Sequence, residues 1–237
     1  MQKNITYLYG IQRGGDKLNT SKMSKVLKCE GLCFKKDMNI IYNIFFKCFM
    51  KKENRPLYNG KFIFFNMAKD INITTNGITV IQKLSVPERF IHIISLENGW
   101  KKYNVPPCNN DNAIEYCKNE CKLQNSTITE FRLVDRTECY YRLMRINRIP
   151  QVLELANNND SNIEEWTEVE KDKKKNNIYK RFIRYKHKKD DYIVILKENR
   201  RKGQIENYNF LTAFPLFDRD NKEEFNKKYR NYIKKVK

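Results

Sequence analysis

The sequence predicts an α+β protein in which a C-terminal antiparallel sheet is preceded and followed by helices, with an N-terminal α+β domain before it. Three observations predict this class. Short runs of β-branched and aromatic residues are separated by Asn, Gly and Pro. Apolar residues recur at helical spacing near both ends of the chain. With 14 Tyr and 14 Phe, the chain can also bury a core.

The first elements belong to the predicted N-terminal domain, residues 1–129. Residues 35–52 carry apolar side chains at helical spacing and predict a helix with one buried face. Four short runs rich in β-branched or aromatic residues predict a small sheet, and residues 110–122 predict a short helix. The four strand segments are 62–65, 71–75, 78–81 and 90–94.

The second predicted domain, residues 130–237, begins with a helix. Asp135 and Glu138 fit a capping box for a helix from Arg136, which Pro150 should kink or stop. Residues 157–177 are rich in Asn and charged residues and predict loops. Three strands and a closing helix follow, and the short connections between the strands favour antiparallel pairing. The strands are 178–185, 191–197 and 208–214, and Asp220 with Glu223 caps the helix.

Charge is unevenly distributed along the chain. The total is +19, of which residues 171–237 contribute +13, whereas residues 151–170 hold six acids and no base. In the basic third, cations alternate with Tyr and Phe, which suits phosphate contact combined with base stacking. This asymmetry favours two domains and an RNA or other nucleic-acid partner.

The apolar segments of the chain do not predict a secreted or membrane protein. Residues 1–17 lack the apolar stretch of a signal peptide, and residues 38–50, the longest apolar segment, are too short to cross a bilayer. An odd number of cysteines, seven, also argues against a disulfide framework. We therefore expect a cytoplasmic protein with no membrane partner.

Several short motifs of residues 130–237 occur together in one known group. They are Arg142-x-x-Arg145-x-x-Arg148-Ile-Pro, Trp166, Tyr179-x-Arg181, Asp191-Tyr-Ile-Val-Ile-Leu and Asn209-Phe-Leu-Thr-Ala-Phe-Pro. In this part the chain resembles the phage-borne nucleases of the barnase, EndoU, colicin and RelE superfamily. The resemblance implies a RelE- or barnase-like fold for this part, and metal-independent RNA cleavage by attack of the 2′-hydroxyl on the adjacent phosphate.

Such cleavage needs cations for the phosphorane, a base for the 2′-hydroxyl and an acid for the leaving oxygen. The resemblance implies that Arg142, Arg145, Arg181 and Thr212 face one concave site. Tyr179 shares the face of Arg181 and would stack a base or relay a proton. Further nucleic-acid contacts are expected from Arg148, Lys180, Arg184, Tyr185, Arg200 and Arg201, with Arg184 ranked lower because strand alternation puts it on the opposite face.

The chain departs from the pattern of these nucleases at the general base, because neither of its histidines lies in a matched motif. His187 lies in a Lys-rich turn, where neighbouring cations disfavour its protonated form, so it is a candidate base or simply a solvated turn residue. Glu154 is a second candidate, or an ordinary carboxylate on a helix surface.

Four cysteines form the most suggestive metal set. Cys117 and Cys121 are four residues apart and would present both sulfurs on one helix face. With Cys108 and Cys139 they would make a closed, structural zinc site, in which His92 could replace one of the thiolates. Free buried thiols are the alternative. No cofactor is expected for catalysis.

Two functions of different class remain open. One is an RNA-directed endonuclease, a toxin or effector of phage or mobile-element origin. The other is a non-catalytic RNA-binding or host-enzyme-blocking factor, for example an inhibitor of an RNA-guided nuclease. The strand motif favours the nuclease, and the absence of a signature His or Glu favours the binding factor. The sequence leans towards the nuclease.

Overall fold

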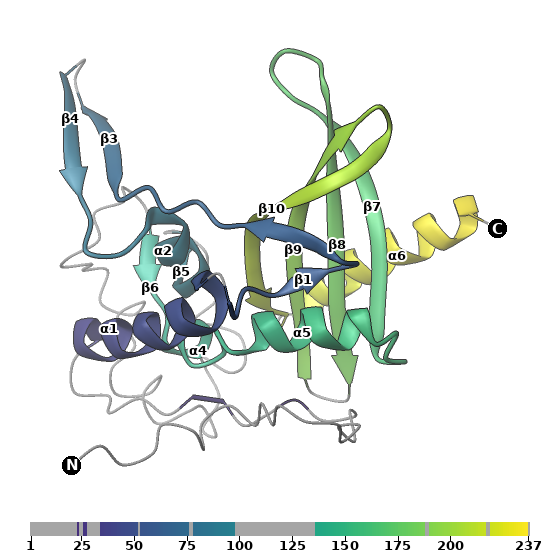
Figure 1. The fold of residues 1–237 in the computed structure, drawn as a ribbon, viewed down its shortest axis with the longest axis horizontal. Coiled ribbons are helices and arrows are strands. Elements are labelled where there is room, and N and C mark those ends of the chain that lie inside the picture. The colour runs from purple at the N-terminus through teal and green to yellow at the C-terminus, as the bar shows by residue number, and fades with distance from the viewer. Residues whose placement is uncertain are drawn as a thin grey trace.

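The structure is a computed structural model that describes residues 23, 26–27, 34–51, 53–75, 78–97, 136–187, 190–216 and 219–236 (Figure 1). It confirms the α+β class. A six-stranded, open, mixed sheet has the order β1-β2-β10-β9-β8-β7, with helices before and after it in the chain.

Four strands of the sheet form an antiparallel meander. They are β7 (Ile163–Lys171), β8 (Asn177–His187), β9 (Asp190–Arg201) and β10 (Gln204–Pro215). The antiparallel pairing predicted for β8, β9 and β10 is confirmed. The prediction of an acidic loop in place of strand β7 is wrong. Trp166, in the middle of β7, is completely buried against the sheet, so the burial of one large ring stabilises this edge strand despite its four acids.

The sheet is mixed because a strand from the N-terminal part joins it. Strands β1 (Leu57–Tyr58) and β2 (Lys61–Phe64) form a hairpin through Asn59 and Gly60, both at positive φ. Strand β2 then runs parallel to β10, with Ile63 opposite Tyr208. The prediction of a wholly antiparallel sheet is therefore wrong for this edge, where Ile63 and Tyr58 are fully buried.

The other N-terminal segments differ from the predicted small sheet. Strands β3 (Asp70–Thr75) and β4 (Ile78–Lys83) form a separate hairpin that projects from the body (Figure 1). Residues 90–94 belong to helix α2 (Glu88–Ile94) and not to a strand. Four apolar side chains of α2 are buried, a pattern that suits a helix enclosed by neighbours better than a half-exposed strand.

The start of the C-terminal part also differs. Strand β6 (Arg136–Glu138) replaces the start of the predicted helix, because its backbone pairs with β5 (Ser95–Glu97). Helices α4 (Tyr140–Leu143) and α5 (Arg148–Asn157) follow. Pro150 is the third residue of α5, in the first turn, where backbone N–H groups have no partner within the helix. Its missing N–H therefore costs no helical hydrogen bond, so Pro150 is compatible with the start of α5 and does not stop a helix.

Two predicted helices are confirmed. Helix α1 (Phe34–Phe45) continues into the π-helical segment η2 (Phe46–Met50), and α6 (Arg219–Val236) closes the chain. The helix predicted at residues 110–122 lies outside the described residues. No helix in the described ranges is long and apolar enough to cross a membrane.

The sheet separates two cores. Helices α1, α2, α4 and α5 pack on one face, which we call the α5 face, around Ile183, Val194 and Leu196. Helix α6 covers the opposite face, which we call the α6 face. There Trp166 stacks on Phe182 with ring centroids 5.0 Å apart. Described residues on both sides of the predicted boundary at 129/130 share the sheet and the larger core, and the boundary itself stays a prediction.

Candidate functional site

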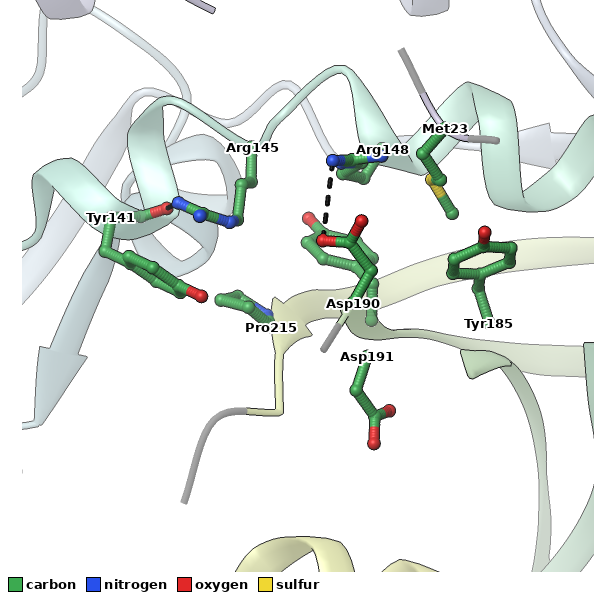
Figure 2. A pocket seen from close by; sticks show the side chains of 9 residues that line it. Met23, Tyr141, Arg145, Arg148, Tyr185, Asp190, Asp191 and Pro215 are labelled. Carbon is green, nitrogen blue, oxygen red and sulfur yellow. Dashed lines mark hydrogen bonds and ion pairs between the residues drawn. The ribbon is translucent and has the colours of Figure 1, made fainter. Parts of the chain in front are cut away.

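A pocket lies where α4 and α5 meet the first residues of β9 and the last residue of β10 (Figure 2). We call it the Arg148 pocket. Its wall includes two arginines, three tyrosines and two aspartates, so most of the side chains that line the pocket are polar. The lining residues are Met23, Tyr141, Arg145, Arg148, Tyr185, Asp190, Asp191, Tyr192 and Pro215.

Arg148, the first residue of α5, is the most unusual group of the pocket. It is only 5% exposed, and its Nη1 atom has no hydrogen-bond partner among the described residues. Its Nη2 lies 3.6 Å from Asp190 Oδ1, a loose ion pair. Burial lowers the pKa of Arg148, and Asp190 opposes this effect. A buried cation with an unused donor is costly, which favours an anionic ligand here.

Arg145 brings a second cation to the same wall. Its guanidinium lies 3.4 Å from the centroid of the Tyr141 ring, and its Nη1 donates to the Tyr141 carbonyl at 3.0 Å. These contacts hold the guanidinium in place one helical turn before Arg148. The nearness of the two charges contributes to lowering the pKa of Arg148. An anion between them would relieve that repulsion.

Arg142, the first arginine of the repeat, has a structural position. Its Nη1 donates to the Ser95 carbonyl at 2.8 Å, and its guanidinium lies 5.3 Å from the centroid of the Phe214 ring. Only 7% of the residue is exposed. Its charge still acts on Tyr192, so Arg142 adds positive potential behind the pocket without lining it.

Tyr185 and Tyr192 contribute neutral hydroxyls. Both are almost fully buried, and burial raises the pKa of each above its ordinary value. Arg148 acts in the opposite direction on both, because a nearby cation favours the phenolate. The net upward shift of the pKa keeps both hydroxyls protonated at neutral pH, where they can donate to an anion or to a leaving oxygen.

The two aspartates of the pocket differ in their engagement. Asp191 accepts two hydrogen bonds from Arg184, at 2.8 and 2.6 Å, and is thereby committed to the α6 face. Asp190 is half exposed and holds Arg148 only loosely. Asp190 is therefore the group that an anion binding to Arg148 would displace.

Replacing Asp190 by Asn should strengthen the binding of inorganic phosphate or of RNA by up to about fivefold. The carboxylate competes for Arg148, and a loose ion pair whose carboxylate is half exposed is worth about 0.2–1 kcal/mol. Titration calorimetry or fluorescence anisotropy measures the change. Asp172→Asn, which removes an equal charge from the exposed β7–β8 turn, is the control and should leave the affinity within twofold.

His187 flanks the pocket at the end of β8. Its ring centroid lies 6.3 Å from that of Tyr185, and its backbone pairs with that of Asp190, the first residue of β9. Its Nδ1 lies 3.0 Å from Asn162 Oδ1. The histidine predicted as a base thus lies next to Tyr185 and Asp190, two residues that line the pocket. Glu154, the other candidate base, is exposed on α5 and does not line the pocket.

Arg181, also predicted as catalytic, belongs to a second group of side chains, which we call the Glu198 cluster. Its members are Thr167, Tyr179, Arg181, Glu198 and Arg200. Glu198 accepts bonds from Arg181 at 3.1 Å and from Thr167 at 3.0 Å, and it pairs with Arg200. Arg200 also lies 4.0 Å from the centroid of the Tyr179 ring. Tyr179 and Tyr185 are six residues apart on β8, roughly 20 Å at the usual strand rise.

Thr212 faces away from both groups. A register shift between Phe210 and Thr212 places Thr212 opposite Ile195, whose side chain packs on the α6 face. Without this β-bulge, Thr212 would share the face of Arg181. The structure therefore does not bring Arg142, Arg145, Arg181 and Thr212 into one concave site.

The remaining predicted nucleic-acid contacts are scattered. Arg184 is completely buried and bonds Asp191, Glu164 and Asn226, so it offers no surface to a nucleic acid in this structure. Lys180 pairs with Glu170, and Arg201, whose side chain is 77% exposed, lies 3.7 Å from Glu206.

The predicted zinc site stays a prediction. Cys108, Cys117 and Cys121 lie outside the described residues. Cys139 is a buried free cysteine, and burial raises the pKa of its thiol. His92 lies 3.5 Å from Glu88 on α2. Among the described residues, no three metal-ligating side chains cluster.

Sequence reasoning missed Asn162, Asp190 and Tyr192 as members of this region. Tyr192 belongs to an apolar strand motif, and Asn162 to an Asn-rich loop, so only their three-dimensional neighbours reveal them. The fold and the pocket together define an α+β protein with a polar pocket lined by arginine, tyrosine and aspartate side chains. Comparison with protein-family models, curated proteins and solved structures found no match. The chemistry of the site therefore has to support any functional assignment.

Proposed function

We propose that the protein is a metal-independent RNA endonuclease and that the Arg148 pocket binds the scissile phosphate. One observation supports this most strongly. The buried Arg148 guanidinium has an unpartnered Nη1, among the described residues, in a pocket that also presents Arg145 and tyrosine hydroxyls. Two neighbouring guanidinium groups with neutral donors suit a phosphodiester, whose oxygens accept several hydrogen bonds at once.

In the proposed reaction, the 2′-hydroxyl of the substrate attacks the adjacent phosphorus. His187 takes the hydroxyl proton as the new P–O2′ bond forms. Arg145 and Arg148 stabilise the charge of the phosphorane, and the P–O5′ bond breaks as Tyr185 protonates the leaving oxygen. The products are a 2′,3′-cyclic phosphate and a 5′-hydroxyl end. The tyrosinate and the imidazolium then exchange their protons with solvent.

The C-terminal half of α6 supports a nucleic-acid partner. Residues 227–236 contain five cations and no acid. Lys227, Arg230 and Lys234 are exposed at helical spacings of three and four residues, so they form one basic stripe. The stripe lies where α6 extends past the sheet (Figure 1). Cations favour the C-terminal turn of a helix, but that effect is confined to the last turn and does not explain Lys227 and Arg230.

Replacing the three residues of the stripe by Gln should make RNA binding less salt-dependent. Removing one phosphate contact lowers the slope of log Kobs against log salt by about 0.7 for a single strand, so the slope should fall by about 2. Anisotropy titrations at several salt concentrations measure the slope. The control replaces Lys61, Lys69 and Lys83, three exposed cations of the N-terminal part, by Gln. An equal fall in the control would show that net charge matters and the stripe does not.

The direct test of the proposed function is incubation with RNA in EDTA. A DNA oligonucleotide that contains a single ribonucleotide should be cut after that ribonucleotide and leave a 2′,3′-cyclic phosphate, whereas the all-DNA oligonucleotide should stay intact. The absence of cleavage at equimolar protein would overturn the proposal. So would cleavage of the all-DNA strand, because the mechanism needs a 2′-hydroxyl.

The non-catalytic binding factor is the second candidate. The observation that favours it is the separation of the Glu198 cluster from the Arg148 pocket, which leaves fewer groups at one site than the resemblance implies. Salt-dependent RNA binding without cleavage would support this candidate, and the same basic surfaces would then hold RNA or block a host nucleic-acid enzyme.

A further inference from the structure

A chain of side-chain hydrogen bonds leads from the loop after α5 to His187. Asp160 Oδ1 accepts from Asn162 Nδ2 at 2.8 Å, and Asn162 Oδ1 lies 3.0 Å from His187 Nδ1. The three residues come from the loop between α5 and β7 and from the end of β8. Nothing in the reaction described above uses Asp160 or Asn162.

The orientation of the Asn162 amide follows from its partners. Its Nδ2 group can only donate, and the Asp160 carboxylate is the acceptor beside it. The Asp160 carboxylate also accepts the backbone N–H of Asn162 at 2.8 Å, which holds the two residues together. A flipped amide would place its carbonyl oxygen against that carboxylate. The oxygen of the amide therefore faces His187.

The tautomer of His187 follows in turn. An amide oxygen can only accept, so the Nδ1 atom of His187 must carry a proton. In the neutral ring the lone pair then lies on Nε2. We propose that Asn162, oriented by Asp160, is a positioning residue that holds His187 as the Nδ1–H tautomer and so presents Nε2 as the proton acceptor. The catalytic consequence rests on the proposed function, and the tautomer does not.

The hydrogen bond to His187 is not needed to close the loop. Backbone bonds already do so, from Ile163 N–H to the Asp160 carbonyl at 3.0 Å and from Lys186 N–H to the Asn162 carbonyl at 2.8 Å. An Asn162→Ala variant retains both of these bonds. The loop should thus keep its fold when the side chain of Asn162 is removed, and the ring of His187 alone should respond.

Nitrogen NMR of the imidazole rings tests the tautomer without RNA. The chain has two histidines, so His92→Gln leaves His187 as the only signal. In that background, neutral His187 should show a protonated Nδ1 and an unprotonated Nε2. Asn162→Ala should produce a mixture of tautomers. The double variant Asp160→Asn/Asn162→Asp, which keeps an acceptor beside His187 without two adjacent carboxylates, should restore Nδ1–H. A protonated Nε2 in the parent protein, or no change in Asn162→Ala, would overturn the proposal.

Kinetics give the second readout. Asn162→Ala should lower kcat by about 10–100-fold, the usual effect of removing a partner that orients a functional histidine, with little change in KM. The double variant Asp160→Asn/Asn162→Asp should recover most of the loss. Asn158→Ala, at the end of α5 and outside the chain of bonds from Asp160 to His187, should match the parent. An Asn162→Ala variant with parental kcat would refute the positioning role. A parent protein that shows the Nδ1–H tautomer but does not cut RNA would refute only the proposed function.

Discussion

The Arg148→Met variant is expected to cut RNA about 100–1000-fold more slowly than the parent protein, with no loss of folding stability. The rate falls because a fixed donor to the transition-state charge is removed. Stability holds or rises because Met fills a similar volume without a buried charge and an unpartnered donor. The residue left behind, Asp190, is half exposed and can be solvated. Initial cleavage rates and chemical denaturation measure the two effects.

Binding of a simple anion tests the same side chain without catalysis. Sulfate should raise the Tm of the parent protein, since a ligand that binds only the folded state stabilises it, and it should have a smaller effect on Arg148→Met. Arg201→Gln removes an equal charge at an exposed position and should behave like the parent. Cleavage within threefold of the parent in Arg148→Met would contradict the assignment of Arg148 as a phosphate ligand. A large drop in stability would instead make Arg148 a structural residue.

The parts of the fold that sequence could predict are those with strong local patterns. Residues 35–52 and the segment after Asp220 have helical apolar spacing, and both are helices. The apolar character of β9 on both faces predicts a central strand, and β9 pairs with β8 and β10. In each of these cases the pattern depends on neighbours along the chain, so no distant contact was needed.

The errors occurred where distant contacts decide the structure. Strand β2 joins β10 from more than 140 positions away, and β6 is a strand because β5 lies beside it. The site shows the same limit. Spacing places Arg145 and Arg148 on one side of the same segment, and the pocket contains both. The one-residue bulge before Thr212, by contrast, reverses which face that residue occupies, and no feature of the motif shows it.

Arg184→Met is expected to destabilise the protein by about 3–5 kcal/mol, or roughly 6–20 °C in Tm for a chain of this size. Arg184 is completely buried between β8, β9 and α6. It bonds the buried Asp191 twice and reaches Glu164 at 3.2 Å, so its removal leaves the Asp191 carboxylate without its cation and Glu164 with Lys186 alone. The cost is that of a buried, unpaired charge and not of a single hydrogen bond. Thermal and chemical denaturation measure it.

Lys186→Met is the matched control, because Lys186 lies two residues further along β8 and shares the partners Glu164 and Asn226. Its side chain is 45% exposed, so its removal should change stability by less than about 1 kcal/mol. If Arg184 were instead a nucleic-acid contact, Arg184→Met would keep the parental Tm and lose RNA affinity.

The buried position of Arg184 has a consequence for function as well. Asp191 lines the Arg148 pocket, so the ion pair that anchors α6 also holds one wall of the proposed site. RNA cleavage in Arg184→Met should therefore fall together with stability, whereas in Arg148→Met it falls alone.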